Sequence, residues 1–311
     1  MSAKPPIEQV MQPQANIHQV TYTVFPGATL TYNTVNSSEE FFRPAVPANV
    51  LEIAHCRRGR VECAIGERLT YLAPGDLSII CGDRPALPAS FPLGHYEGIH
   101  VRLNVAEAPR CLSCLLDDVD VRPEQLIQKF RSTGRVHFVR EDLRIAHIFD
   151  ELYNVPEEIK LGYFKVKLLE LLLFLSVLDV EPATDTPPLV SRPQADLAKA
   201  VCRYLTDRMD SHITLEQLSE HFHVSGTGIK NSFKAVYGMS VYAYIRSQKM
   251  QAAAKLLRET DRSVLDIAGS FGYDNGSKFA KAFRDCCGMS PNEFRRNGGK
   301  CPNGAENVES L

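Results

Sequence analysis

The chain has 311 residues, of which 44% are hydrophobic and 23% charged, and its formal net charge at pH 7 is −2. This composition is that of an ordinary globular protein, and the length favours two domains because a single domain usually holds about 100 to 200 residues. A net charge so close to zero argues against a non-specific architectural DNA binder, which would carry more positive charge.

No segment has the pattern of a targeting sequence or a membrane span. The amino terminus lacks the basic start, the apolar core and the small-residue cleavage site of a signal peptide. The most apolar stretch, residues 168–178, contains Glu170 and is shorter than the roughly 20 apolar residues that a span needs. We therefore expect a cytoplasmic protein without a membrane partner.

The nine cysteines are an odd number and lie scattered along the chain, which favours reduced thiols over a disulfide framework. Cys111 and Cys114 form a C-x-x-C that suits a redox pair or half of a zinc site. The sequence has no second C-x-x-C or closely spaced histidine pair to complete four ligands. We therefore expect no metal and no cofactor.

The amino-terminal part predicts β-structure followed by helices. Residues 1–20 are polar and are expected to be poorly ordered. Several short apolar runs, separated by turn residues, then predict a sandwich or barrel with strands at residues 19–25, 29–34, 50–56, 60–65, 68–72, 77–80 and 95–103. From residue 123 the hydrophobic period becomes helical, with helices expected at 123–128, 142–152 and 158–179.

A segment with four prolines, residues 181–193, is predicted to be a linker that neither helix nor sheet crosses. The charge differs on its two sides. Residues 193–297 hold 15 Lys and Arg against 11 Asp and Glu, whereas residues 1–190 hold 18 against 24. The basic carboxyl-terminal half fits a polyanionic partner, and residues 298–311 are expected to be a disordered tail.

Beyond the linker the chain repeats itself at a spacing of about fifty residues. Thr214, Leu218 and Phe222 recur 49 positions later as Ser263, Ile267 and Phe271. A second group recurs 50 positions later: Ile229, Phe233, Gly238, Met239 and Ser240 return as Phe279, Phe283, Gly288, Met289 and Ser290. Each repeat therefore predicts one structural unit, and a turn absorbs the one-residue difference.

Each unit predicts a helix, a short turn and a second helix. Thr214 with Gln217, and Ser263 with Asp266, have the spacing of a capping box at the start of the first helix. Good caps for the second helices and glycines at their expected ends follow in both units: Ser225, Asn275, Gly238 and Gly288.

The second helix of each unit predicts one buried and one polar face. Ile229 and Phe233, like Phe279 and Phe283, are four apart and so share the buried face. The opposite faces can donate hydrogen bonds to phosphates and base edges through Thr227, Lys230, Asn231, Lys234, Ser277, Lys278, Lys281 and Arg284. A basic helix face is often only solvated surface, so it is the duplicated register that supports binding to double-stranded DNA.

Between the units, Ser240 predicts the cap of a long helix over residues 241–259. At 1.5 Å per residue this helix spans about 28 Å, and with its flanking turns it approaches the roughly 34 Å of one DNA turn. Two recognition helices can therefore enter successive major grooves on one face of DNA.

Residues 238–257 (GMSVYAYIRSQKMQAAAKLL) and 263–295 (SVLDIAGSFGYDNGSKFAKAFRDCCGMSPNEFR), together with the repeat, resemble the AraC/XylS family of transcription regulators. The resemblance covers roughly residues 194–297 and implies a DNA-binding domain of seven helices whose third and sixth helices read the target. It implies RNA polymerase as a partner, and activation more often than repression. Carried over by position, the residues that face DNA are Thr227, Lys230 and Asn231 in the first unit and Ser277, Lys278 and Lys281 in the second. Lys234 and Asn275 complete the predicted DNA-contacting set.

Two departures from the family pattern concern glycines. Gly226 and Gly228 lie in the first turn of the first recognition helix, where each glycine costs about 0.5–1 kcal/mol relative to alanine. Gly276 occupies a position where the family often has a polar reader, so one base contact is expected to be absent.

The run LTYLAPGDLSII, residues 69–80, resembles the strand, PGD turn and strand of cupin barrels. The expected fold class is thus α+β with two domains: a cupin-like barrel over residues 21–122 with a helical extension over 123–180, and an all-α DNA-binding domain. A catalytic cupin needs a metal-binding histidine cluster, whereas His55 stands alone and His95 and His100 fall on opposite strand faces. We therefore expect no enzyme.

The barrel interior is the expected site of a small-molecule effector. Its predicted lining is Glu52, Ala54, Cys56, Glu62, Cys81 and Tyr96. The alternative is a barrel filled by its own side chains, which would serve as a dimerisation scaffold. The helix at residues 160–179 is apolar over more of its circumference than a surface helix needs. One face is expected to pack on the barrel, and the other either meets the same helix of a second subunit in a homodimer or packs within the same chain.

A DNA-repair enzyme that uses a methyl-accepting cysteine is a rival interpretation. Such an enzyme needs an activated thiol in an added catalytic domain, and the sequence around Cys111, Cys202 and Cys301 shows no such setting.

Overall fold

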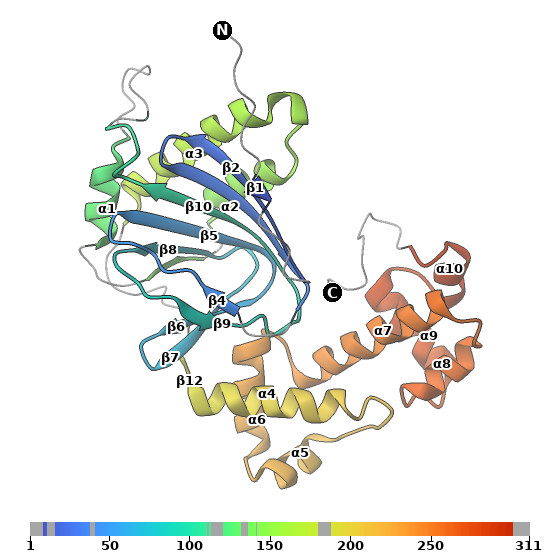
Figure 1. Ribbon diagram of the computed structural model, residues 1–311. Coiled ribbons are helices and arrows are strands. Elements are labelled where there is room, and N and C mark those ends of the chain that lie inside the picture. The colour runs from blue at the N-terminus through green and yellow to red at the C-terminus, as the bar shows by residue number, and fades with distance from the viewer. Residues whose placement is uncertain are drawn as a thin grey trace. The chain divides into compact units, whose positions relative to one another are not determined.

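The computed structural model describes residues 9–10, 16–37, 41–110, 112, 121–131, 136–140, 142–179 and 188–300. The chain divides into two compact units, residues 1–189 and 190–311. The first is rich in strands and the second is helical (Figure 1). Within the described ranges no helix is long and apolar enough to cross a membrane.

A seven-stranded antiparallel sheet is the framework of the first unit. Its order is β1 (Gln9–Val10), β2 (Ile17–Phe25), β3 (Ala28–Val35), β10 (Tyr96–Asn104), β5 (Val50–Gly59), β8 (Leu77–Cys81) and β11 (His137–Val139). Strand β2 begins at Ile17, inside the segment that was expected to be poorly ordered. The strands β1 and β11 were not predicted.

Helices cover one face of this sheet (Figure 1). They are α1 (Pro123–Arg131), α2 (Leu143–Tyr153) and α3 (Lys160–Val177), with a 3-10 turn at Glu157–Ile159 before α3. Leu51, Ile53 and Ile99 point from the sheet into this core and are 0% exposed, as are Phe149 and Phe164 from the helices. All three helices were predicted, and α1 extends three residues beyond its predicted end.

Two short strand pairs lie on the opposite face: the hairpin of β6 (Val61–Ile65) with β7 (Arg68–Leu72), and the pair of β4 (Phe41–Arg43) with β9 (Leu87–Ala89), which are distant in sequence. Between them and the large sheet lies a second apolar core that includes Cys56, Leu72, Phe91 and Tyr96. The pairing of β4 with β9 was not predicted.

The expected closed barrel is wrong. Closure requires each strand to pair on both sides. Within the part of the chain that the structure describes, β1 and β11 are instead the two edges of one open sheet. Strand β11 comes from the region between the helices and pairs with β8, and so it extends the sheet by one strand at this edge.

The second unit contains a short strand β12 (Val190–Ser191) and, within residues 188–300, seven helices. These are α4 (Arg192–Thr206), α5 (Leu215–Phe222), α6 (Gly226–Tyr237), α7 (Val241–Glu259), α8 (Val264–Ser270), α9 (Gly276–Cys287) and α10 (Pro291–Arg296). The predicted linker end at Pro193 is wrong, because Ser191 caps α4 and Pro193 stands in its first turn, where no N–H partner is lost.

Candidate nucleic-acid interface

The first helix-turn-helix unit consists of α5 and α6. The predicted capping box is present: the Thr214 hydroxyl accepts from the N–H of Gln217 at 3.3 Å, and the Gln217 side chain accepts from the N–H of Thr214 at 2.8 Å. Ser225 caps α6 by accepting from the N–H of Gly228 at 3.2 Å. Gly238 ends α6 in the left-handed conformation, with φ of 76°.

The second unit, α8 and α9, repeats these devices with different side chains. Ser263 accepts from the N–H of Asp266 at 3.1 Å and donates its own hydroxyl to the Asp266 carboxylate at 2.6 Å. Asn275 caps α9 by accepting from two N–H groups, those of Ser277 at 2.8 Å and Lys278 at 3.3 Å. Gly288 ends α9 with φ of 74°.

The buried faces of α6 and α9 match the prediction. Ile229, Phe233, Phe279 and Phe283 are each 0% exposed. The predicted DNA-contacting side chains are all exposed to solvent: Thr227, Lys230, Asn231, Lys234, Asn275, Ser277, Lys278, Lys281 and Arg284. Their three- and four-residue spacing places those of α6 on one helix face and those of α9 on another.

The glycines at the first position of each recognition helix have a packing explanation. A Cβ on Gly226 would lie 2.8 Å from Cδ2 of Leu215 in the preceding helix, which is too close without a shift of the leucine. A Cβ on Gly276 would lie 3.5 Å from Cδ1 of Leu265, an ordinary contact. Packing therefore favours glycine in the first unit more strongly than in the second.

Helix α7 holds the two units together. It has 19 residues with the predicted bounds, Val241–Glu259, and so spans about 28 Å. The ammonium group of Lys249 donates to the carbonyl of Phe271 at 2.9 Å, after α8, and to that of Ser211 at 3.2 Å, before α5. Arg246 of α7 pairs with Asp285 of α9 at 2.5 Å. These contacts fix the spacing of the recognition helices.

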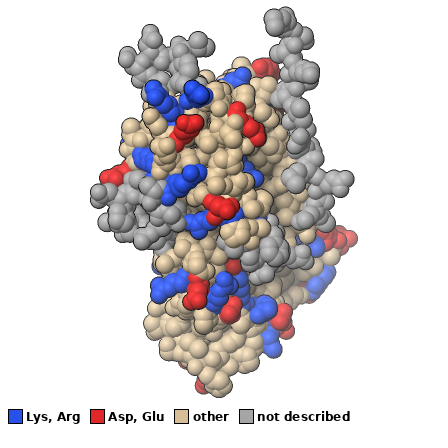
Figure 2. All heavy atoms as spheres, turned by 60° about the vertical axis from the view of Figure 1, so that its left-hand side comes forward, with Lys and Arg blue, Asp and Glu red and all other residues tan. Residues whose placement is uncertain are grey.

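The candidate interface is defined by the repeated geometry of α6 and α9, on whose exposed faces the cationic side chains of Lys230, Lys234, Lys278 and Lys281 lie. On a different face of the molecule, the one that Figure 2 brings forward, blue and red side chains are interspersed and form no single patch of one sign.

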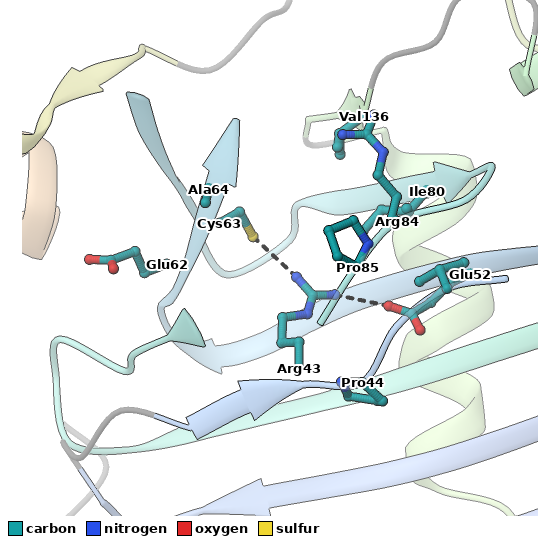
Figure 3. A pocket seen from close by; sticks show the side chains of 11 residues that line it. Arg43, Pro44, Glu52, Glu62, Cys63, Ala64, Ile80, Arg84, Pro85 and Val136 are labelled. Carbon is teal, nitrogen blue, oxygen red and sulfur yellow. Dashed lines mark hydrogen bonds and ion pairs between the residues drawn. The ribbon is translucent and has the colours of Figure 1, made fainter. Parts of the chain in front are cut away.

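In the first unit, two of the predicted effector-pocket residues, Glu52 and Glu62, line a cavity of about 50 Å³ (Figure 3). Cys56 and Tyr96 are buried in the apolar core between the sheets and do not line it. Ala54 is 2% exposed and is also not among the lining residues. The placement of Cys81 was wrong, because it lies in the core under the helices, where its thiol donates to the carbonyl of Ile127 at 3.5 Å.

Arg43, Cys63 and Arg84 also line the cavity and were not predicted from the sequence. The guanidinium of Arg43 donates to the Glu52 carboxylate at 3.0 Å and to the Cys63 sulfur at 3.4 Å (Figure 3). The second oxygen of Glu52 pairs with Nε of Arg102 at 3.0 Å. The pKa of the neighbouring His100 is lowered to about 4, mainly by burial; Glu52 acts to raise it, and Arg43 and Arg102 act to lower it.

Within the described ranges, the other candidate ligand groups form no metal cluster. His55 stacks on Phe149 with ring centroids 4.1 Å apart, and burial lowers its pKa to about 4. Among the described residues no group of three or more His, Cys, Asp and Glu side chains could hold a metal ion. Cys111, Cys114 and Cys301 lie outside the described residues.

A family model described as a helix-turn-helix domain matches residues 218–297. The arabinose operon regulatory protein of Salmonella typhimurium is 28% identical over 131 residues, which are 42% of this chain and 44% of that protein. An uncharacterized HTH-type transcriptional regulator of Escherichia coli, YdiP, is 35% identical over 105 residues, or 34% of this chain and 35% of that protein. The chain thus spans less than half the length of these relatives.

Among solved structures, the chain is similar to the C-terminal domain of AraT, a response regulator from Geobacillus stearothermophilus. The two are 27% identical, the match covers 36% of this chain and 91% of that domain, and the TM-score is 0.32. The sequence matches fall on the segment that contains the two helix-turn-helix units. Through this segment the chain is similar to transcription regulators of the AraC/XylS family.

Proposed function

We propose that this protein is a sequence-specific transcription regulator of the cytoplasm, without enzymatic activity, that binds double-stranded DNA with α6 and α9. The observation that carries the proposal is the duplication itself. Two units with equivalent cap positions and equivalent buried positions present exposed polar faces on two helices, and α7 connects the units. By family resemblance, RNA polymerase is the partner on DNA and activation is the favoured outcome.

The proposed contacts divide between base edges and phosphates. Lys278 and Lys281 lie on the exposed face of α9 opposite Phe279 and Phe283, so they can reach DNA without disturbing the core. Asn275 accepts two backbone N–H bonds with its side-chain oxygen, which leaves its amide nitrogen as the donor toward DNA. Residues near the amino-terminal end of a recognition helix are those that usually reach base edges.

The test is selection of bound fragments from random DNA by the full-length protein, followed by sequencing. An enriched motif with two half-sites about one DNA turn apart supports the proposal. Lys278→Ala and Lys281→Ala should weaken binding to this motif. If a lysine contacts only phosphate, binding falls about equally on all sequences and the salt slope falls by about 1. Arg68→Ala, an exposed arginine on β7, is the matched control.

No enriched motif would overturn sequence-specific binding. Unchanged affinity in both lysine variants would remove α9 from the contact surface.

We further propose that a small effector, bound in the first unit, controls DNA binding. The cavity lined by Arg43, Glu52 and Cys63 supports this proposal. A ligand shifts activity only if it binds one state better than the other. At a free concentration 100 times its Kd it stabilises the protein by about 2.7 kcal/mol. A melting-temperature screen of metabolites tests this, and the absence of any stabilising compound would contradict it.

A second candidate is a ligand-independent regulator whose first unit is a dimerisation scaffold. It is favoured by an exposed apolar stripe at seven-residue spacing along α3: Ile159 is 53% exposed, Val166 61% and Leu173 41%, followed by Val177 at 74%. Such spacing is typical of a helix that pairs with a second helix. Sedimentation of the wild type and of Val166→Glu tests the scaffold, and a wild type that stays monomeric at micromolar concentration would contradict it.

A further inference from the structure

The cavity of the first unit lies between β5 and β8 of the large sheet and the short strands β4 and β6 (Figure 3). Arg43 lines it from β4. We propose that it binds a small monoanion, a carboxylate with a short apolar chain, and that this carboxylate is the effector. The binding site follows from the residues of the cavity. The effector role rests on the ligand control proposed above.

One of the two terminal nitrogens of Arg43 has only a weak hydrogen-bond acceptor. One oxygen of Glu52 accepts a hydrogen bond from Arg43 at 3.0 Å, and the other forms an ion pair with Nε of Arg102 at 3.0 Å, whose geometry is not that of a hydrogen bond. The other terminal nitrogen of Arg43 reaches the sulfur of Cys63 at 3.4 Å, and a thiol sulfur is a weak acceptor. A carboxylate oxygen at this position would give the guanidinium a charge-assisted hydrogen bond, which is about twice as strong as a neutral one.

The charges near Arg43 also favour an anion. Two guanidinium groups, which remain protonated, face the single carboxylate of Glu52, whose side chain is only 7% exposed. His100 adds no positive charge at neutral pH, because burial lowers its pKa to about 4. The group therefore carries one excess positive charge, of which Arg43, 15% exposed, is the less solvated cation and Arg102, 34% exposed, the more solvated one. A monoanion beside Arg43 would balance this charge.

The two remaining charged residues of the lining point elsewhere in Figure 3. The carboxylate of Glu62 is directed away from Arg43 and accepts from the hydroxyl of Tyr71 at 2.8 Å. The guanidinium of Arg84 lies toward Val136, on the side away from Arg43. Because Glu52 has both oxygens engaged, it is poorly placed to hold a cationic ligand.

The size and the apolar lining of the cavity limit which carboxylates can bind. The cavity of about 50 Å³ has room for roughly three to five water molecules, since one water needs about 10–15 Å³ on this measure. Covalently bonded atoms lie closer together than neighbouring waters, so a ligand with somewhat more non-hydrogen atoms than this can occupy the same space. Apart from Cys63 and the charged residues, the lining is Pro44, Val46, Ala64, Ile80, Pro85 and Val136. A short or branched chain of two to four carbons beyond the carboxylate therefore fits, and a long fatty chain does not.

The first experiment compares two probes of the same shape, isobutyrate and isobutyramide, on the full-length protein at constant ionic strength. Calorimetric titration and melting temperature should show isobutyrate binding about tenfold or more tightly than the neutral amide, and hexanoate should not stabilise the protein. Equal binding of acid and amide would overturn the anion site. So would the failure of every carboxylate from acetate to valerate to bind.

Variants then locate the site. Arg43→Met should weaken isobutyrate binding about tenfold or more, whereas Arg68→Met, an exposed arginine on β7, should leave it unchanged. Arg43→Met also removes a partner of the buried Glu52, so a measurement on the unmutated protein is needed. The methyl NMR signal of Ile80 should shift with isobutyrate and not with isobutyramide. Binding without this shift, or undiminished binding by folded Arg43→Met, would place the ligand elsewhere.

The effector role is decided by DNA binding with and without isobutyrate. A change in affinity for the selected motif supports it, and an unchanged affinity overturns the effector role while leaving the anion site. The failure of this inference is distinguishable from failure of the proposed function, because the selection of a DNA motif requires no ligand.

Discussion

The turn of the first helix-turn-helix unit passes through His223, whereas the second unit has Gly272 at the position 49 residues later. Both residues adopt the left-handed backbone, with φ of 54° and 74°. The duplicated fold therefore repeats the backbone conformation and not the residue type. A Cβ on Gly272 would lie 2.4 Å from the carbonyl oxygen of Asp210. The second unit therefore requires a glycine at this position because of this backbone contact as well as the left-handed conformation.

The two recognition helices, α6 and α9, share their buried positions and differ in their caps. The buried positions are equivalent and fully enclosed in both units, whereas the caps differ, one hydrogen bond from Ser225 against two from Asn275. The first recognition helix also contains two glycines in its first turn and the second contains one. We infer that the second unit is the better preorganised, and that the core contributes equally to both.

The largest effect is expected from the shared core. Phe233→Ala and Phe283→Ala should each lower the free energy of unfolding of the second unit by about 3–5 kcal/mol, because both rings are 0% exposed. Chemical denaturation of the full-length protein measures the loss. The exposed Leu265→Ala, 63% exposed, is the matched control and should stay within about 0.5 kcal/mol. A midpoint that does not move for either phenylalanine would refute its burial.

The next largest effect on stability is expected in the turn of the second unit. Gly272→Ala should destabilise the protein by more than about 1 kcal/mol, because the left-handed backbone and the contact with Asp210 both oppose a Cβ. Gly269→Ala in α8 is the control, since no atom lies within 4 Å of its Cβ position, and it should stabilise by about 0.5–1 kcal/mol. Equal stability of both alanine variants would show that the turn relaxes without cost.

The caps give a smaller difference. Asn275→Ala and Ser225→Ala should each cost about 1 kcal/mol, with the larger loss at Asn275 because two backbone N–H groups lose their acceptor. The measurement is the unfolding free energy without DNA, so that lost DNA contacts do not enter. Asn275→Asp keeps the acceptor and should retain stability. A larger loss at Ser225 would reverse the order of preorganisation inferred above.

Local signals explain why the second unit was predicted in detail. Caps, glycine stops and four-residue spacing act within one or two turns of a helix, so α5, α6, α7 and α9 begin and end within about one residue of their predicted positions. The start of α4 was misplaced because Pro193 was interpreted as a break, although proline suits the first turn of a helix.

The first unit depends on contacts between distant segments. Strand β8 is buried on both faces over most of its length, so its sequence carries no alternation that would assign Cys81 to one face. Strand β4 has three residues, too few for a periodic signal, and for this reason Arg43 was missed. The strand at one edge of the sheet is β11, which pairs with β8 across more than fifty residues. No local sequence pattern predicts such a pairing.

The smallest effect tests whether His223 is only tolerated in its turn. A non-glycine residue in the left-handed region costs about 1–2 kcal/mol, whereas glycine loses about 0.5–1 kcal/mol more backbone freedom on folding. His223→Gly should therefore stabilise the second unit by up to about 1 kcal/mol and make the first turn resemble the one at Gly272. His223→Asn, which tolerates this conformation, should fall between the two. Destabilisation by glycine, measured by thermal unfolding of the same full-length protein, would show that the His223 side chain makes a contact worth more than the backbone strain.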